Sequence, residues 1–186
     1  MSTFPPGWTV FQNRFDGSVD FYRNFSEYEN GFGNMTGEFW LGLRYIEEMT
    51  SQYDSALRFD VTAANDSHIH EVYQNFSLSK YPKFTMHIGN QTVKPLNVSG
   101  LLNQNGQDFS TYDHDVDAWY NAGCALVNHG AWWYSQCYAA NLNGEYGRPP
   151  GSISTINKGF GGFIFIAWQQ YHTLKASKMM FRKQFH

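Results

Sequence analysis

The chain has 186 residues, enough for one domain with a substantial hydrophobic core. Aromatic residues make up 18% of it, charged residues only 16%, and the formal net charge is -3. This composition offers no basic surface for nucleic acid. No apolar run reaches the roughly 18 residues that a membrane-spanning helix needs. We therefore expect a globular domain that neither binds nucleic acid nor inserts into a membrane.

Alternation of apolar and polar residues predicts the strands of the first half. The pattern is strict over residues 8–14 and 56–63 and looser over 71–78 and 84–89. Between the first two strands, apolar residues recur at helical spacing after Thr36-Gly37, which predicts one amphipathic helix over residues 38–50.

The second half has little regular patterning. From residue 97 to residue 160, Gly, Asn, Ser and Asp are frequent, which favours a region built from loops. The apolar run 163–168 is a candidate buried strand, and 178–182 again resembles a strand. The tryptophans are predicted to be core residues rather than a sugar-stacking surface: Trp8, Trp40, Trp132, Trp133 and Trp168.

One acidic loop suggests a metal site. Asp113, Asp115 and Asp117 occupy alternate positions, and their mutual repulsion has to be offset by a cation or by solvent. Hard oxygen ligands at this spacing suit calcium. An EF-hand is excluded, because its sixth and twelfth positions would be Ala118 and Cys124 instead of Gly and Glu. Standing alone, such a triplet is more often an ordinary acidic surface turn.

The two cysteines, Cys124 and Cys137, are compatible with free thiols, a disulfide or half of a metal site. No second Cys/His cluster at zinc spacing supports the metal site. Six Asn-x-Ser/Thr sequons favour a secreted glycoprotein: Asn24, Asn34, Asn65, Asn75, Asn90 and Asn97. The sequence has no GxSxG, HExxH or phosphate-binding glycine loop, so we expect no enzyme.

Long sequence blocks identify a family. FSTYDHDVDAWYNAGCALVNHGAWWYSQCYAANLNGEYG (109–147), GWTVFQNRFDGSVDFYRNF and GFGNMTGEFWLG resemble, in the same order, the C-terminal domain of fibrinogen and fibrinogen-related proteins. The resemblance runs from Gly7 to about Arg182. Fibrinogen-related lectins such as ficolins and tachylectins are the most similar in function.

The resemblance implies an α+β fold with a central, mostly antiparallel sheet and a flanking helix. Within a single domain, residues 7–98 and 175–186 would form the sheet subdomain. Residues 99–174 would form a loop-rich subdomain for calcium and ligand. A family domain has a further N-terminal subdomain, and the chain has neither this nor a signal peptide. We expect a fragment of a longer secreted protein that oligomerises through its upstream region.

The resemblance also implies the site residues. Cys124 and Cys137 pair in a disulfide. The calcium ligands would be the carboxylates of Asp115 and Asp117 with the backbone carbonyls of Trp119 and Asn121, while Asp113 would act through water.

The implied ligand pocket lies beside that loop, with a cis peptide before the second cysteine. Its residues would be Asn128, Gln136, Cys137, Tyr138 and Phe160. Fibrinogen uses carboxylates to capture an amine, where this chain has Asn128 and Phe160. A neutral pocket suits N-acetyl groups better.

We therefore expect a secreted pattern-recognition lectin domain for acetylated glycans on microbial surfaces, with calcium as a structural ion. The alternative is a receptor- or matrix-binding module of the angiopoietin-like type that binds no sugar.

Overall fold

The computed structural model describes residues 7–96, 100–120 and 122–184. Its largest sheet has seven strands in the order β2-β3-β1-β11-β4-β5-β8. All pairings in this sheet are antiparallel, as predicted. The strands are β1 (Thr9–Arg14), β2 (Phe32–Gly33), β3 (Phe39–Trp40), β4 (Ser55–Thr62), β5 (His68–Tyr73), β8 (Gln91–Val93) and β11 (Ala176–Lys183).

The last strand of the chain lies in the middle of this sheet. β11 pairs with β1 on one side and with β4 on the other, so the two ends of the described chain meet there. In β4 the side chains of Leu57, Phe59 and Val61 are fully buried, while Arg58 and Asp60 point to the opposite, partly exposed face. The predicted strands 8–14, 56–63 and 178–182 are confirmed within a few residues.

The helix predicted over 38–50 is wrong in its first part. Only α2 (Leu43–Thr50) is helical, and it begins after Gly42, whose φ is +116°. Phe39 and Trp40 instead form β3, which pairs with both β1 and β2. Their apolar side chains are needed in the core, and backbone pairing on both sides outweighs the local helical spacing.

Three other predicted strands are altered. The segment 71–78 divides between β5, which begins earlier at His68, and β6 (Ser77–Leu78). In 84–89 only β7 (Met86–His87) is a strand, paired with β6. The run 163–168 changes from strand β10 (Ile164–Phe165) to helix α4 (Ile166–Gln169). An apolar run of this length is compatible with either structure.

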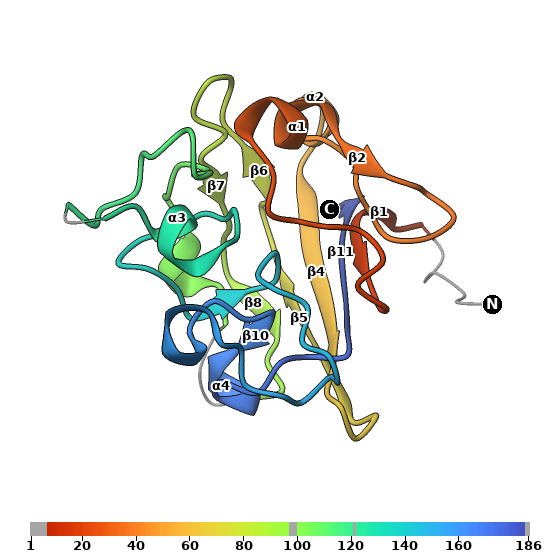
Figure 1. The fold of residues 1–186 in the computed structure, drawn as a ribbon. Coiled ribbons are helices and arrows are strands. Elements are labelled where there is room, and N and C mark those ends of the chain that lie inside the picture. Colours follow the sequence, from red (N-terminus) through yellow and green to blue (C-terminus); the bar gives the residue numbers. More distant parts are fainter. Residues whose placement is uncertain (1–6, 97–99, 121, 185–186) are drawn as a thin grey trace.

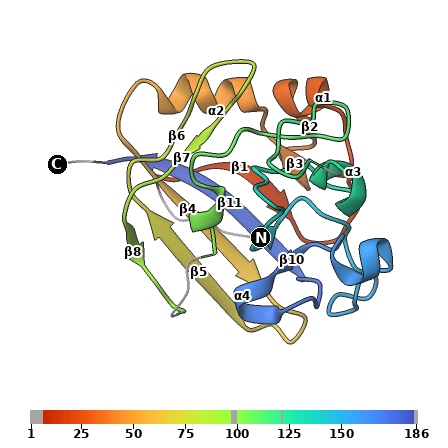
Figure 2. The ribbon, with the colours of Figure 1, turned by 90° about the vertical axis from the view of Figure 1, so that its left-hand side faces the viewer.

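The remaining elements lie around the sheet. α1 (Phe25–Asn30) and α2 lie side by side near one end of it (Figure 2), while α3 (Cys124–Asn128), α4 and β10 lie on one side (Figure 1). β9 (Ala140–Asn141) pairs with β10, and two 3-10 turns, η1 (Leu102–Gln104) and η2 (Ile156–Gly159), complete this side. No helix in the described ranges is long and apolar enough to cross a membrane.

One hydrophobic core joins the sheet to the loops. Phe59 of β4 makes an edge-to-face contact with Phe165 of β10, at 5.6 Å between ring centroids. Trp40, Trp132 and Trp133 are buried, as predicted, whereas Trp8 and Trp168 are only partly buried. The division into sheet and loop-rich subdomains stays a prediction.

Candidate functional site

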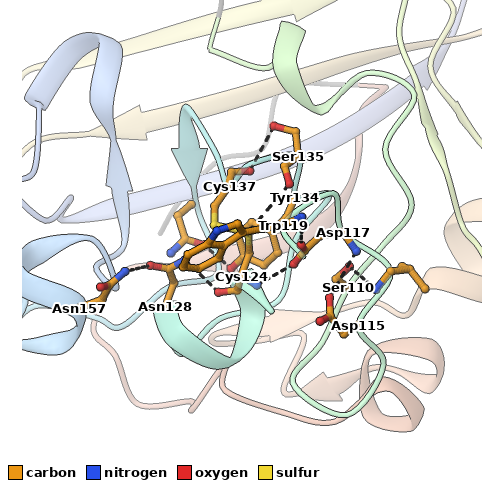
Figure 3. The surroundings of a disulfide bond; sticks show 12 residues. Ser110, Asp115, Asp117, Trp119, Cys124, Asn128, Tyr134, Ser135, Cys137 and Asn157 are labelled. Atoms are coloured by element: carbon orange, nitrogen blue, oxygen red, sulfur yellow. Dashed lines mark hydrogen bonds between the residues drawn. A yellow bond between two sulfur atoms is a disulfide. The ribbon is translucent and has the colours of Figure 1, made fainter. Parts of the chain in front are cut away.

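A disulfide fixes the centre of the candidate site. Cys124, the first residue of α3, is bonded to Cys137, with 5.6 Å between their Cα atoms. This confirms the predicted pairing. The bond ties the segment after Trp132-Trp133 to the helix that follows the acidic loop (Figure 3).

Asp117 organises the acidic loop, residues 113–117. Its carboxylate accepts hydrogen bonds from the backbone N–H of Trp119 at 2.7 Å and of Cys124 at 2.6 Å. The N–H of Asp117 in turn lies 3.4 Å from the carboxylate of Asp115. Burial raises the pKa of Asp117, and the neighbouring charge of Asp115 raises it further.

The side chain of Asp113 makes different contacts from those of Asp115 and Asp117. Its Oδ1 accepts hydrogen bonds from the N–H of Phe25 at 2.9 Å and from the hydroxyl of Thr111 at 2.6 Å. This aspartate therefore links the acidic loop to the start of α1 instead of facing Asp115 and Asp117.

Asp115 and Asp117 are the predicted carboxylate ligands of calcium. Burial first, and the neighbouring charge of Asp115 second, raise the pKa of Asp117, and a hard cation beside the two carboxylates would stabilise their charged forms. The described residues include no group of three or more His, Cys, Asp or Glu side chains placed to hold a metal ion. Further ligands would have to be backbone carbonyls, such as that of Trp119, or water. Asn121, the other predicted ligand, lies outside the described residues.

Backbone hydrogen bonds hold the predicted ligand segment against the acidic loop. The N–H of Ala118 donates to the carbonyl of Ser135 at 3.2 Å, and the N–H of Ser135 donates to the carbonyl of Cys137 at 2.8 Å. The peptide between Gln136 and Cys137 is cis, as predicted. Gln136 is exposed, so this turn is presented at the surface.

The predicted ligand residues include two aromatic side chains, Tyr138 and Phe160, and Phe160 packs against a third aromatic residue, Tyr171. Phe160 and Tyr171 are 40% and 39% exposed and meet edge to face at 4.8 Å. Burial, and secondarily Tyr171, raises the pKa of Tyr138, whose buried hydroxyl has no hydrogen-bond partner among the described residues. Tyr171 was not predicted from the sequence. It reaches Phe160 after a chain reversal at Gln170, whose φ of +53° is unusual for that residue type.

Asn128 is a buried connector. It is 1% exposed, its Nδ2 donates to the carbonyl of Cys124 at 2.9 Å, and its Oδ1 accepts from Nδ2 of Asn157 at 2.8 Å (Figure 3). Direct contact with a ligand would require Asn157 to move aside. Sequence reasoning did not find Asn157, because 29 residues separate it from Asn128.

The predicted ligand residues differ in exposure: Gln136 and Phe160 are exposed, whereas Cys137 and Tyr138 are half-buried. A cavity of about 720 Å³ lies beside Asn128 and Asn157, since their neighbours His129 and Ile156 are among the residues that line it. Gln136, Cys137, Tyr138 and Phe160 are not among its lining residues, so a ligand bound at these four residues would lie outside that cavity.

Comparison with known families agrees with this architecture. The family described as fibrinogen beta and gamma chains, C-terminal globular domain, matches residues 1–184. The chain belongs to the fibrinogen C-terminal domain family.

This fibrinogen C-terminal domain has relatives of two kinds. It is 41% identical to Ficolin-3 of Homo sapiens over 147 residues, covering 78% of this chain and 48% of that protein. It is 38% identical to Angiopoietin-2 of Rattus norvegicus over 178 residues, covering 95% of this chain and 35% of that protein. The chain thus spans less than half the length of these curated relatives.

Solved structures share the fold. The fibrinogen-like globe domain of human ANGPTL6 superposes with a TM-score of 0.89 at 30% identity, covering 96% of this chain and 79% of that one. Lamprey fibrin D-dimer, complexed with the peptide Gly-His-Arg-Pro-amide, gives a TM-score of 0.85 at 29% identity, covering 95% of this chain and 61% of that one. The predicted fold class is confirmed.

Proposed function

We propose that this domain is a secreted lectin domain, not an enzyme, that binds N-acetylated glycans such as N-acetylglucosamine on microbial surfaces. The observation that carries the proposal is the cis peptide before Cys137 together with the uncharged side chains of the predicted ligand residues. Asn128 and Phe160 stand where fibrinogen has the carboxylates that capture an amine, so the main attraction for an ammonium group is lost. The similarity to Ficolin-3 supports the same function.

Each of these groups would make a specific contact with the ligand or support one. The backbone N–H groups of Cys137 and Tyr138 would donate to the acetyl carbonyl. Phe160 and Tyr171 would pack against the acetyl methyl group and the sugar ring. Asn128 would act by holding Asn157 and the turn before Phe160, since its own amide is already bonded.

Calcium would have a structural role. Held by Asp115 and Asp117 with backbone carbonyls, including those of Trp119 and Asn121, the ion would neutralise the repulsion between the two carboxylates. The acidic loop would then hold Ser135 through the N–H of Ala118 and so fix the cis turn. The ion need not touch the ligand for this.

A single site of this kind binds weakly, with a Kd on the order of millimolar, so useful avidity requires several linked domains. We infer that the natural protein is an oligomer assembled through a region upstream of this domain.

The test is a calorimetric titration of N-acetylglucosamine into the domain, with glucose as the control sugar, in calcium and again after chelation. We expect binding of the acetylated sugar alone, weakened at least several-fold by chelation. Absence of binding by the folded, calcium-loaded domain would contradict the lectin function.

Two matched variants separate the ion's effect from general damage to the loop. Asp117→Asn should remove the thermal stabilisation by calcium and weaken sugar binding, because Asp117 belongs to the carboxylate pair. Asp113→Asn should keep both, because Asp113 faces α1. If Asp117→Asn loses calcium yet binds the sugar normally, the proposed coupling is wrong.

The second candidate is a receptor- or matrix-binding module. The 38% identity to Angiopoietin-2 and the similarity to ANGPTL6 favour it, and the similar lamprey fibrin D-dimer is complexed with a peptide ligand. Free N-acetyl sugars separate the two functions, because they release a glycan target and leave a protein target bound.

A further inference from the structure

We infer that Asn34 and Asn65 carry N-linked glycans, which flank a groove on the face of the sheet that points away from the candidate binding site. The inference rests on the secretion included in the proposed function. The sequons alone do not tell which of the six asparagines are modified. The side-chain geometry of the described sequons distinguishes them.

Asn34 lies in the turn between β2 and β3 and is exposed. Its Oδ1 accepts two hydrogen bonds from Thr36 of the same sequon, from the N–H at 2.9 Å and from the hydroxyl at 2.8 Å. These bonds hold the carbonyl oxygen against the turn. The amide nitrogen, attached to the same carbon, then points away from the turn toward solvent.

Asn65 repeats this arrangement in the turn between β4 and β5. It is exposed, and its Oδ1 accepts from the N–H of Ser67 at 3.1 Å and from the hydroxyl of Ser67 at 2.6 Å. Two distant turns therefore present an asparagine amide nitrogen in the same way.

The other described sequons differ in their side-chain contacts, although Asn75 and Asn90 are exposed as well. Asn24 is partly buried and caps α1 through its Oδ1, beside Phe25, which is bonded to the acidic loop. The Nδ2 of Asn75 packs against Gly89, at 3.2 Å from the position that a Cβ would take there. In the sequon of Asn90 the hydroxyl of Thr92 is bonded to the neighbouring strand β5. Asn97 lies outside the described residues.

The two turns border one groove of about 640 Å³. Met35 and Thr36 contribute to it from the β2–β3 turn, and Thr62 and His68 from the two ends of the β4–β5 turn. Since β1 and β11 lie between β3 and β4, the turns approach the groove from opposite sides. Met35, 71% exposed beside Asn34, shows how open this side is.

This groove lies on the face opposite the loops. Phe59 of β4 points toward Phe165 on the loop side, so its neighbours Arg58 and Asp60, which line the groove, point the other way. The sequence contains no sequon after Asn97. Glycans at Asn34 and Asn65 would cover the groove and leave the candidate binding site accessible.

The modification requires an oligosaccharide donor linked to a lipid through a diphosphate. The bond between the sugar's anomeric carbon and the diphosphate oxygen breaks, and a bond from that carbon to Nδ2 of asparagine forms. The amide nitrogen loses one proton, and the lipid diphosphate leaves with the bonding electrons. No oxidant or reductant is needed.

The test is to secrete the chain from a eukaryotic cell line behind a supplied leader peptide. Peptide mass mapping before and after enzymatic removal of N-glycans then locates each modified asparagine. We expect Asn34 and Asn65 to be occupied in more than half of the molecules and Asn24 to be unmodified. An unmodified Asn34 or Asn65 in the secreted protein would overturn the inference.

Variants give a second readout. Asn34→Gln and Asn65→Gln should each remove one glycan-sized gel shift, the double variant two, and Asn24→Gln none. Enzymatic removal of the glycans should leave N-acetylglucosamine binding unchanged. Absence of N-acetylglucosamine binding both before and after removal of the glycans would refute the lectin function and leave the glycan sites standing. Binding only after their removal would refute the inference that the glycans leave the candidate binding site accessible.

Discussion

Among single residues, Asn157 shows how side chains far apart in the sequence shape the site. It has a φ of +45°, and its amide is the partner of the buried Oδ1 of Asn128. Its backbone carbonyl also accepts the N–H of Phe160 at 3.1 Å. Asn157 thus joins α3 to the turn that presents Phe160.

We predict that Asn157→Gly lowers the free energy of unfolding by about 1–3 kcal/mol more than Lys158→Gly, because it leaves a buried amide oxygen without a donor. Both positions have positive φ, so glycine suits the backbone equally at each. Urea denaturation of the two variants measures the difference. Equal effects would show that the amide pair contributes nothing.

Among the strands, β5 carries a carboxylate that joins the sheet to the chain entering the loop region. Glu71 is buried, and its Oε2 accepts from the hydroxyl of Tyr73 at 2.5 Å and from the N–H of Gly100 at 3.1 Å. Its Oε1 has no partner among the described residues. Burial raises the pKa of Glu71, and these donors only partly offset the effect.

We predict that Glu71→Gln makes the protein more stable at neutral pH and leaves stability unchanged at about pH 4. With its pKa raised, Glu71 binds its proton more tightly in the folded state than in the unfolded chain. The free energy of unfolding of the wild type therefore falls as pH rises from the ordinary pKa of a glutamate to the raised pKa of Glu71. The Glu71→Gln variant has no titrating group at this position, so its free energy of unfolding does not fall for this reason. Denaturant unfolding at both pH values checks it; a variant less stable at neutral pH would mean that the hydrogen bonds to the carboxylate dominate.

For the whole molecule, the continuous core argues that the sheet and the loop region unfold together. The ring of Phe165 packs on Phe59, and the indole N–H of Trp133 donates to the carbonyl of Phe84 at 2.8 Å. Core contacts therefore join the loop region to the sheet. The disulfide closes only the 13-residue separation within the loop region.

We predict one cooperative unfolding transition, with the same midpoint for far-ultraviolet circular dichroism and for tryptophan fluorescence. Circular dichroism reports mainly on the sheet, whereas fluorescence is weighted toward the loop region, which holds four of the six tryptophans: Trp119, Trp132, Trp133 and Trp168. Two separate midpoints would show that the predicted subdomains unfold independently.

The sequence by itself determined what depends on neighbours along the chain. Alternation predicted β1, β4 and β11, since side chains on successive strand residues point to opposite faces. The resemblance to one family predicted the Cys124–Cys137 bond and the cis peptide before Cys137. The roles of the acidic loop and of Gln136–Tyr138 in binding calcium and ligand stay predictions.

Only the tertiary structure decided which distant groups meet. Residues 39–40 form a strand because they pair with β1 on one side and β2 on the other, and this pairing outweighs the local helical spacing. The tertiary structure also buried Asn128 against Asn157 and brought Tyr171 to Phe160. Such contacts arise when separate segments pack into one core, and no local spacing in the sequence encodes them.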